Sequence, residues 1–178
     1  MVRRTILLVA LLASTSALQA TPARVEFCNR YPAECAVNLD EEMKVELDGT
    51  LWDLIDRVNR DVNDTIIQIT DMEHWGVPDR WDFAEDGRGD CEDMQLLKRK
   101  RLREAGVPQR AMRLAVVRDE NGNGHAVLVI RTSNRGDWVL DNRRNDILHP
   151  QDTGYTFREI ESAYNSGLNP ITDVATLK

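Results

Sequence analysis

Residues 87–105 read GRGDCEDMQLLKRKRLREA, a pattern that predicts a helix beginning close to Cys91. Asp90 is a favourable N-cap residue, and Asp93 stands three residues later, where the second member of a capping box lies. At a helix N-terminus, unpaired backbone N–H groups and the helix dipole favour the thiolate of Cys91 over the thiol. The segment therefore fits a nucleophile with part of an oxyanion site, and it equally fits a turn, a cap and a buried structural cysteine.

The rest of the sequence predicts a single exported domain. The chain has 178 residues, of which 42% are hydrophobic and 30% charged, as is typical of one globular domain. Arg3 and Arg4 precede an apolar run at residues 5–12 that small residues follow, so residues 1–20 predict a secretory signal peptide. We expect Sec-dependent export, which leaves residues 21–178 as one domain.

The charge of the mature chain restricts its partners. The formal net charge is −7, and removal of residues 1–20 takes away two arginines and no acid, which gives −9. An acidic domain is a poor partner for nucleic acid or an anionic membrane, and it is compatible with a divalent cation. No second hydrophobic stretch approaches the length of a membrane span, so we expect no transmembrane anchor in the mature chain.

The three cysteines make an odd number. Cys28 and Cys35 are seven positions apart, and in an oxidising compartment they are the natural disulfide pair. This pairing leaves Cys91 as a free thiol, which in such a compartment needs protection or a function. The alternative is a disulfide between Cys91 and one of the other two, which would exclude catalysis by Cys91.

The hydrophobic periodicity predicts helices followed by an antiparallel sheet. Apolar residues recur at three- and four-residue steps from 51 to 66, which predicts an amphipathic helix with Thr50 as its N-cap. Three strands are expected at 111–117, 125–131 and 137–141, with a hairpin turn at 119–124. A helix that carries the cysteine and packs on an antiparallel sheet gives an α+β fold.

Three segments are harder to interpret. Residues 38–48 predict a short helix or a strand. The basic run at 98–103 is interpreted as complementing the dipole at the end of its helix. Beyond residue 142 the chain is polar and irregular, and we expect its aromatic residues to cover one edge of the sheet.

His125 opens the second expected strand, and Asp141 closes the third. Neighbouring antiparallel strands can bring these two positions to the same end of the sheet, facing the helix that begins at Cys91. The arrangement predicts a catalytic triad of nucleophile, base and orienting carboxylate, in the order Cys91, His125, Asp141. The rivals for the base and the acid are His74, His149, Asp137 and Asp146, which are expected at the surface, in turns or beyond the strand.

Segments 89–93, 124–128 and 139–142 together resemble the bacterial transglutaminase-like cysteine peptidases, the family that includes the periplasmic LapG proteases. The resemblance covers about residues 25–150. It implies a papain-like, transglutaminase-type fold, with Cys91 as nucleophile, His125 as base and Asp141 as orienting acid.

The resemblance also implies a cofactor and partners. Members of the LapG branch bind calcium through acids that flank the cysteine, which here are Asp90 and Glu92. Three carboxylates around Cys91 would raise its pKa, whereas a bound divalent cation would cancel their charge. We interpret Asp93 as complementing the helix N-terminus. The LapG branch further implies a large surface adhesin as protein substrate and an inner-membrane receptor that sequesters the enzyme.

The sequence therefore predicts an exported thiol protease, which uses Cys91, His125 and Asp141 to hydrolyse a peptide bond. Two alternatives stay open. The same triad serves acyl transfer to an amine, as in transglutaminases, and the same fold serves a non-catalytic binding module.

Overall fold

A computed structural model of the chain describes residues 21–171. The expected signal peptide at residues 1–20 lies outside the described residues. The helices, in chain order, are α1 (Pro22–Arg30), α2 (Pro32–Cys35), α3 (Gly49–Thr65), α4 (Asp71–His74) and α5 (Cys91–Glu104), with 3-10 turns at Gln109–Ala111 and Pro150–Asp152. The strands are β1 (Ile67–Gln68), β2 (Arg88–Gly89), β3 (Met112–Arg118), β4 (Gly124–Ile130), β5 (Trp138–Leu140), β6 (Thr156–Glu161) and β7 (Leu168–Pro170).

Five strands form one antiparallel sheet in the order β5-β4-β3-β6-β7. The three strands expected from the periodicity are confirmed as β3, β4 and β5. Strand β4 lies inside the sheet and is buried along its whole length except Gly124, which accounts for its continuous apolar sequence.

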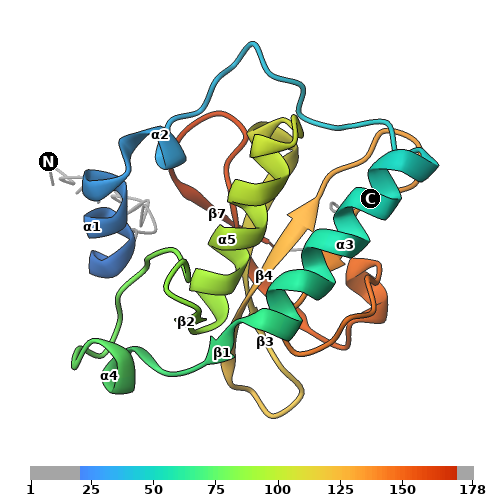
Figure 1. Ribbon diagram of the computed structural model, residues 1–178. Helices are drawn as coiled ribbons and strands as arrows, with labels where there is room; N and C mark the ends of the chain where they lie inside the picture. Colours follow the sequence, from blue (N-terminus) through green and yellow to red (C-terminus); the bar gives the residue numbers. More distant parts are fainter. Residues whose placement is uncertain (1–20, 172–178) are drawn as a thin grey trace, which may run out of the picture.

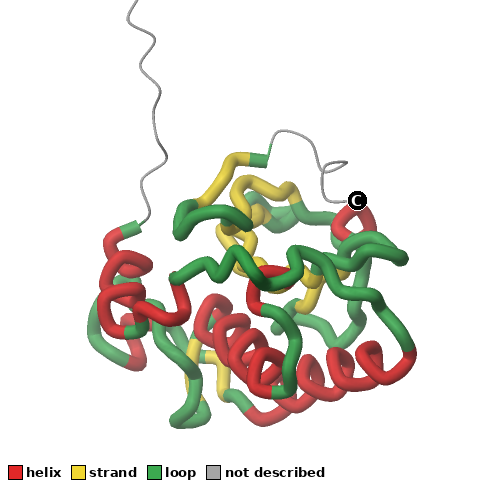
Figure 2. Tube along the Cα trace, turned by 90° about the horizontal axis from the view of Figure 1, so that it is seen from above, coloured by secondary structure: helices red, strands yellow, loops and turns green. Residues whose placement is uncertain are grey.

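Helices α3 and α5 cover one face of this sheet (Figure 1). Helix α5 packs on β4, and α3 packs beside α5, so that in Figure 2 both helices lie on the same side of the strands. Apolar side chains such as Ile55, Leu96, Leu128 and Leu140 fill the space between helices and sheet. A cysteine-bearing helix packed on an antiparallel sheet confirms the predicted α+β fold.

The helix starts differ in part from the sequence-based predictions. Helix α3 is capped by Asp48, whose Oδ1 accepts from the Leu51 backbone N–H at 2.8 Å, so the prediction of Thr50 as N-cap is wrong. Asp90 is the N-cap of α5 as predicted, but its side chain makes no capping hydrogen bond. The predicted capping box is also wrong, because Asp93 accepts from the backbone N–H of Asp82 at 2.7 Å instead.

The basic run at 98–103 does not lie entirely on the surface. Lys98 and Arg99 are 0% and 2% exposed, so its interpretation as a complement to the helix dipole is wrong for these two residues. Arg99 forms an ion pair with Glu161, whereas the Lys98 Nζ has no hydrogen-bond partner among residues 21–171.

The segment before the first long helix and the end of the chain were also predicted incompletely. Residues 38–48 form neither a helix nor an extended strand, and only Val45 makes an isolated bridge, to Thr132. The chain beyond residue 142 contributes β6 and β7 to the sheet, where the sequence suggested only aromatic residues over its edge. None of the helices within residues 21–171 combines the length and apolar character that a membrane span requires.

The predicted disulfide between Cys28 and Cys35 is confirmed, and it joins α1 to α2. Cys91 is therefore free. A second, two-stranded sheet pairs β1 with β2 in parallel and holds α4 near the start of α5. Gly89 in β2 permits this approach, since a Cβ atom there would lie 2.7 Å from the Cβ of Asp93.

Candidate active site

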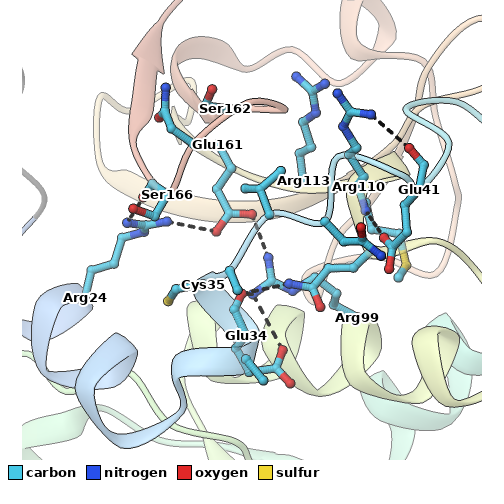
Figure 3. A pocket seen from close by; sticks show the side chains of 17 residues that line it. Arg24, Glu34, Cys35, Glu41, Arg99, Arg110, Arg113, Glu161, Ser162 and Ser166 are labelled. Atoms are coloured by element: carbon cyan, nitrogen blue, oxygen red, sulfur yellow. Dashed lines mark hydrogen bonds and ion pairs between the residues drawn. The ribbon is translucent and has the colours of Figure 1, made fainter.

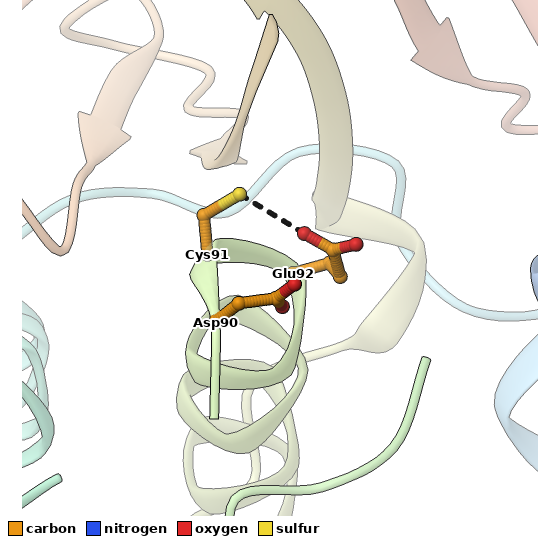
Figure 4. A group of neighbouring side chains, drawn as sticks. All are labelled: Asp90, Cys91 and Glu92. Carbon is orange, nitrogen blue, oxygen red and sulfur yellow. Dashed lines mark hydrogen bonds between the residues drawn. The ribbon is translucent and has the colours of Figure 1, made fainter. Parts of the chain in front are cut away.

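Cys91 is the first residue of α5 and is partly exposed (Figure 4). Its thiol donates a hydrogen bond of 2.9 Å to Glu92 Oε2. Burial and the negative charges of Glu92 and Asp90 raise the pKa of the thiol well above its ordinary value, while the backbone N–H of Ala126 acts in the opposite direction. The acidic flank thus favours the thiol over the thiolate, which opposes the effect of the helix N-terminus.

His125 and Asp141 lie at the same end of the sheet. The antiparallel pairing of β4 with β5, which sets Leu128 opposite Leu140, brings them together. His125 Nε2 lies 2.8 Å from Asp141 Oδ1, and both residues are buried. With Nε2–H donated to the carboxylate, the lone pair is on Nδ1, which is buried and has no hydrogen-bond partner among the described residues.

Asp141 accepts hydrogen bonds on both oxygens. Besides His125, the Arg143 backbone N–H donates to Oδ1 at 3.0 Å, and the Tyr155 hydroxyl donates to Oδ2 at 2.6 Å. Burial alone would raise the pKa of Asp141, but the bonds from His125 and Tyr155 lower it to about 2. The carboxylate therefore stays ionised beside the imidazole.

Asn63, on α3, holds the backbone around Asp141. Its side-chain nitrogen lies 2.9 Å from the carbonyl oxygen of Asp141, 3.0 Å from that of Arg144 and 2.8 Å from Asn145 Oδ1. Neither Asn63 nor Tyr155 was predicted as a site residue, because only the tertiary fold brings their side chains to Asp141.

The four rival residues are engaged elsewhere or exposed. His74 Nε2 lies 2.8 Å from Asp86 Oδ2, and His149 Nδ1 lies 2.9 Å from the backbone oxygen of Asp137. Asp137 itself is buried in an ion pair with Arg131. Asp146 is exposed.

A cluster of acidic residues adjoins Cys91. Three groups have potential ligand atoms within 4.8 Å of one another: Asp90, Cys91 and Glu92; Asp71, Asp90 and Asp93; Asp71, Asp79 and Glu92. The predicted pair Asp90 and Glu92 is thus close together, and Asp93 faces the same cluster. Asp71 and Asp79 were not predicted, because no local spacing links them to the cysteine.

The chemistry of this cluster fits a hard cation. Burial and neighbouring acids raise the pKa of Asp90 to about 9, and burial raises that of Asp93 to about 8, with further contributions from Glu92 and Asp71. Asp71 Oδ1, Asp90 Oδ1 and Asp93 Oδ2 are buried without a hydrogen-bond partner among the described residues. Calcium prefers carboxylate oxygens, which are the ligand atoms that this cluster supplies.

Comparisons with known proteins agree with the fold. Three solved structures of LapG from Legionella pneumophila have a similar fold. One has a TM-score of 0.59 at 23% identity and covers 76% of each chain. The calcium-bound form has a TM-score of 0.59 at 23% identity, covering 74% of this chain and 73% of that one. The EGTA-treated form has a TM-score of 0.58 at 22% identity, covering 76% and 73%.

The comparison with curated proteins found no match. The family described as bacterial transglutaminase-like cysteine proteinase BTLCP matches residues 15–170. This match spans most of the sequence, including the helix with Cys91 and the strands with His125 and Asp141. The chain therefore belongs to the bacterial transglutaminase-like cysteine proteinases.

Proposed function

We propose that this cysteine peptidase hydrolyses peptide bonds with Cys91 as nucleophile, His125 as general base and Asp141 as orienting acid. The observation that carries the proposal is the His125 ring, held by Asp141 through Nε2 with its buried Nδ1 left unpaired. The next residue, Ala126, directs its backbone N–H to the sulfur of Cys91.

The proposed reaction has two halves. His125 Nδ1 accepts the thiol proton, and the thiolate of Cys91 attacks the peptide carbonyl while N–H groups in the first turn of α5 stabilise the oxyanion. The imidazolium gives its proton to the leaving amine, which leaves a thioester. A water molecule, deprotonated by His125, then attacks the thioester, and the acid product leaves as Cys91 regains a proton.

We also propose calcium as a cofactor, held by Asp71, Asp79, Asp90 and Glu92. When bound, calcium would supply positive charge that offsets these carboxylates. Glu92 raises the pKa of Cys91 both by its charge and by accepting the thiol hydrogen bond. Neutralising Glu92 therefore favours the thiolate. Solved structures of the L. pneumophila protein in calcium-bound and EGTA-treated forms support the choice of metal.

We further propose a periplasmic location and a protein substrate. The location rests on the signal-peptide pattern at residues 1–20 and on the disulfide between Cys28 and Cys35, a bond typical of oxidising compartments. A surface adhesin as substrate and an inner-membrane receptor as partner rest on the family resemblance alone.

The function is tested by mixing the mature protein with bacterial surface proteins and identifying new N-termini by mass spectrometry. We expect cleavage by the native protein, none by Cys91→Ala or His125→Ala, and a strong decrease for Asp141→Asn. Asp146→Asn, at an exposed site, is the matched control for Asp141→Asn and should cleave normally. Unchanged cleavage by Cys91→Ala would contradict the proposal.

Two further measurements separate the alternatives. Incorporation of a labelled primary amine in preference to hydrolysis would show that the reaction is acyl transfer to an amine rather than hydrolysis of a peptide bond. Failure of iodoacetamide to label Cys91 in the folded protein, both with calcium and with EGTA, would favour a non-catalytic binding module.

A further inference from the structure

A cavity of about 260 Å³ lies away from Cys91, between the disulfide-linked α2, the middle of α5, and the adjoining parts of β3 and β6 (Figure 3). Arg99 of α5 lines it, eight residues beyond Cys91, which places it roughly 12 Å further along the helix axis. The three residues of the proposed triad are not part of its lining. The cavity is thus a separate feature of the domain.

The lining of this cavity is rich in arginine, although the protein is acidic overall. It contains four arginines and three glutamates, whereas the whole chain has a net charge of −7. The charged residues of the lining are Arg24, Arg99, Arg110, Arg113, Glu34, Glu41 and Glu161.

Two of the three glutamates of the lining pair with arginines, whereas Glu41 Oε2 accepts only from the Arg110 backbone N–H, at 3.1 Å. Glu161 Oε1 lies 3.3 Å from Arg24 Nη2, and Glu161 Oε2 accepts from Arg99 Nη1 at 2.6 Å and from the Leu114 backbone N–H at 3.0 Å. Glu34 Oε2 lies 3.9 Å from Arg99 Nη2, and Glu34 also forms an ion pair with Arg103. Glu34 and Glu161 thus offset part of the positive charge of the lining.

Arg110 is also satisfied, but by neutral groups. Its Nε donates to the Ala163 carbonyl oxygen at 2.9 Å, and its Nη1 donates to the carbonyl oxygens of Leu39 and Glu41 at 2.8 and 2.9 Å. These bonds fix its guanidinium without cancelling its charge.

Arg113 has no such partner. It projects from β3, is partly buried, and its side chain makes no hydrogen bond or ion pair with residues 21–171; no dashed line reaches it in Figure 3. Its Nε is buried without an acceptor, as are the Nε atoms of Arg24 and Arg99, whose side chains are at least nine-tenths buried. Burial and the nearby Arg131 lower the pKa of Arg113, while Asp137, Tyr164 and Glu161 act in the opposite direction. These acids do not form a direct ion pair with Arg113, so an oxyanion in the cavity would give its partly buried guanidinium a hydrogen-bonded partner.

We propose that this cavity binds a small ligand with a phosphate or carboxylate group, and that Arg113 is the residue that pairs with this oxyanion. A planar guanidinium offers two parallel N–H donors, which match the oxygens of either group. The volume is smaller than that of pockets for drug-sized ligands, so it suits a small anion. The site does not depend on the proposed peptidase activity.

Isothermal titration of the mature protein with inorganic phosphate, and separately with succinate, tests the proposal. We expect saturable binding of at least one of the two anions, and the tighter of them identifies the class of group. Arg113→Gln should weaken binding at least 10-fold. Arg158→Gln, which removes the same charge from an exposed position on β6 outside the cavity, should bind as the native protein does.

Arg113→Lys provides a second variant that retains the charge and loses the bidentate geometry. We expect it to bind more weakly than the native protein, so it tests the site even if Arg113→Gln does not fold, as judged by circular dichroism. Absence of binding of both anions to the native protein, or equal affinities in the native protein and the Arg113 variants, would overturn the proposal.

Discussion

The Tyr155 hydroxyl donates a hydrogen bond of 2.6 Å to Asp141 Oδ2, while the His125 ring occupies the other oxygen of the same carboxylate. The rings of His125 and Tyr155 also meet edge to face, with centroids 5.5 Å apart. Tyr155 thus contacts both the base and the acid of the proposed triad. Its hydrogen bond restrains the carboxylate that holds the imidazole.

Tyr155→Phe should lower kcat/KM about 10-fold or more, because a hydrogen bond to a charged group contributes about 1.5–3 kcal/mol. It should also reduce the free energy of unfolding. The pKa of Asp141 is lowered from 3.8 to about 2, so its ionised form stabilises the fold above about pH 4, and this contribution is lost as the pH falls towards 2. The stability difference between native protein and variant should therefore shrink between pH 4 and pH 2.

Tyr164→Phe is the control, since the Tyr164 side chain is 67% exposed. It should change neither kcat/KM nor the pH dependence of unfolding. A Tyr155→Phe variant with native kinetics would show that Tyr155 does not position Asp141.

Calcium should raise the melting temperature, because a ligand that binds only the folded state stabilises it. At a calcium concentration 100 times the dissociation constant, the gain is about 2.7 kcal/mol, or roughly 5–10 °C for a chain of this size. Differential scanning calorimetry with calcium and with EGTA measures the shift. Asp71→Asn should abolish it, whereas Asp53→Asn, an exposed acid on α3, should retain it. An equal shift in both variants would exclude Asp71 as a ligand.

Lys98→Met should stabilise the protein at neutral pH by about 1–4 kcal/mol, since it replaces a fully buried amine that has no hydrogen-bond partner among the described residues by an apolar side chain. Burial lowers the pKa of Lys98 from 10.5 to about 7. The unfolded chain therefore binds more protons between pH 7 and 10.5, and the native protein gains stability as the pH rises through this range.

The advantage of Lys98→Met should accordingly decrease from pH 7 to pH 10, as measured by urea unfolding. Lys100→Met, on the same helix but partly exposed, should change stability by less than about 1 kcal/mol. A destabilised Lys98→Met protein would show that the buried ammonium is favourable.

Asn63→Ala should cost about 1–3 kcal/mol of stability and reduce activity, because it leaves backbone oxygens beside Asp141 without a donor. Urea unfolding and kcat/KM measure the two effects. Asp64→Ala, one position along α3 and exposed, is the matched control and should leave both nearly unchanged.

Replacing Cys28 and Cys35 together by serine should lower the free energy of unfolding by about 2–3 kcal/mol, the value expected for closing a loop with a sequence separation of 7. Thermal unfolding of this double variant and of the native protein, each with and without a reductant, measures the effect. The reductant should destabilise the native protein and leave the double variant unaffected. A double variant as stable as the oxidised native protein would contradict the prediction.

Much of the fold was predictable because the decisive patterns are local. The helix at Cys91 has a glycine-rich approach, an N-cap and helical spacing, and β3 to β5 alternate or run apolar between clear turns. Once the strands are adjacent and antiparallel, His125 and Asp141 must lie at one end, and the register confirms this.

The remaining features depend on contacts that no local pattern records. Asp71 and Asp79 approach the cysteine only because β1 pairs with β2. Strand β6 follows a polar, irregular segment, and its pairing with β3 shifts register at Val116, which obscures the alternation. Lys98 has the sequence context of a surface residue, and only the packing of α5 against the sheet buries it.

The short parallel pairing of Ile67–Gln68 with Arg88–Gly89 closes the segment between them at its base. That segment supplies Asp71 and Asp79 to the acidic cluster. The strand pairing holds its two ends next to each other, whatever the number of residues between them. The segment can therefore be exchanged as one unit. Exchanging it between relatives should alter the affinity of the proposed metal site or the access to the sulfur of Cys91, while helix α5 stays in place.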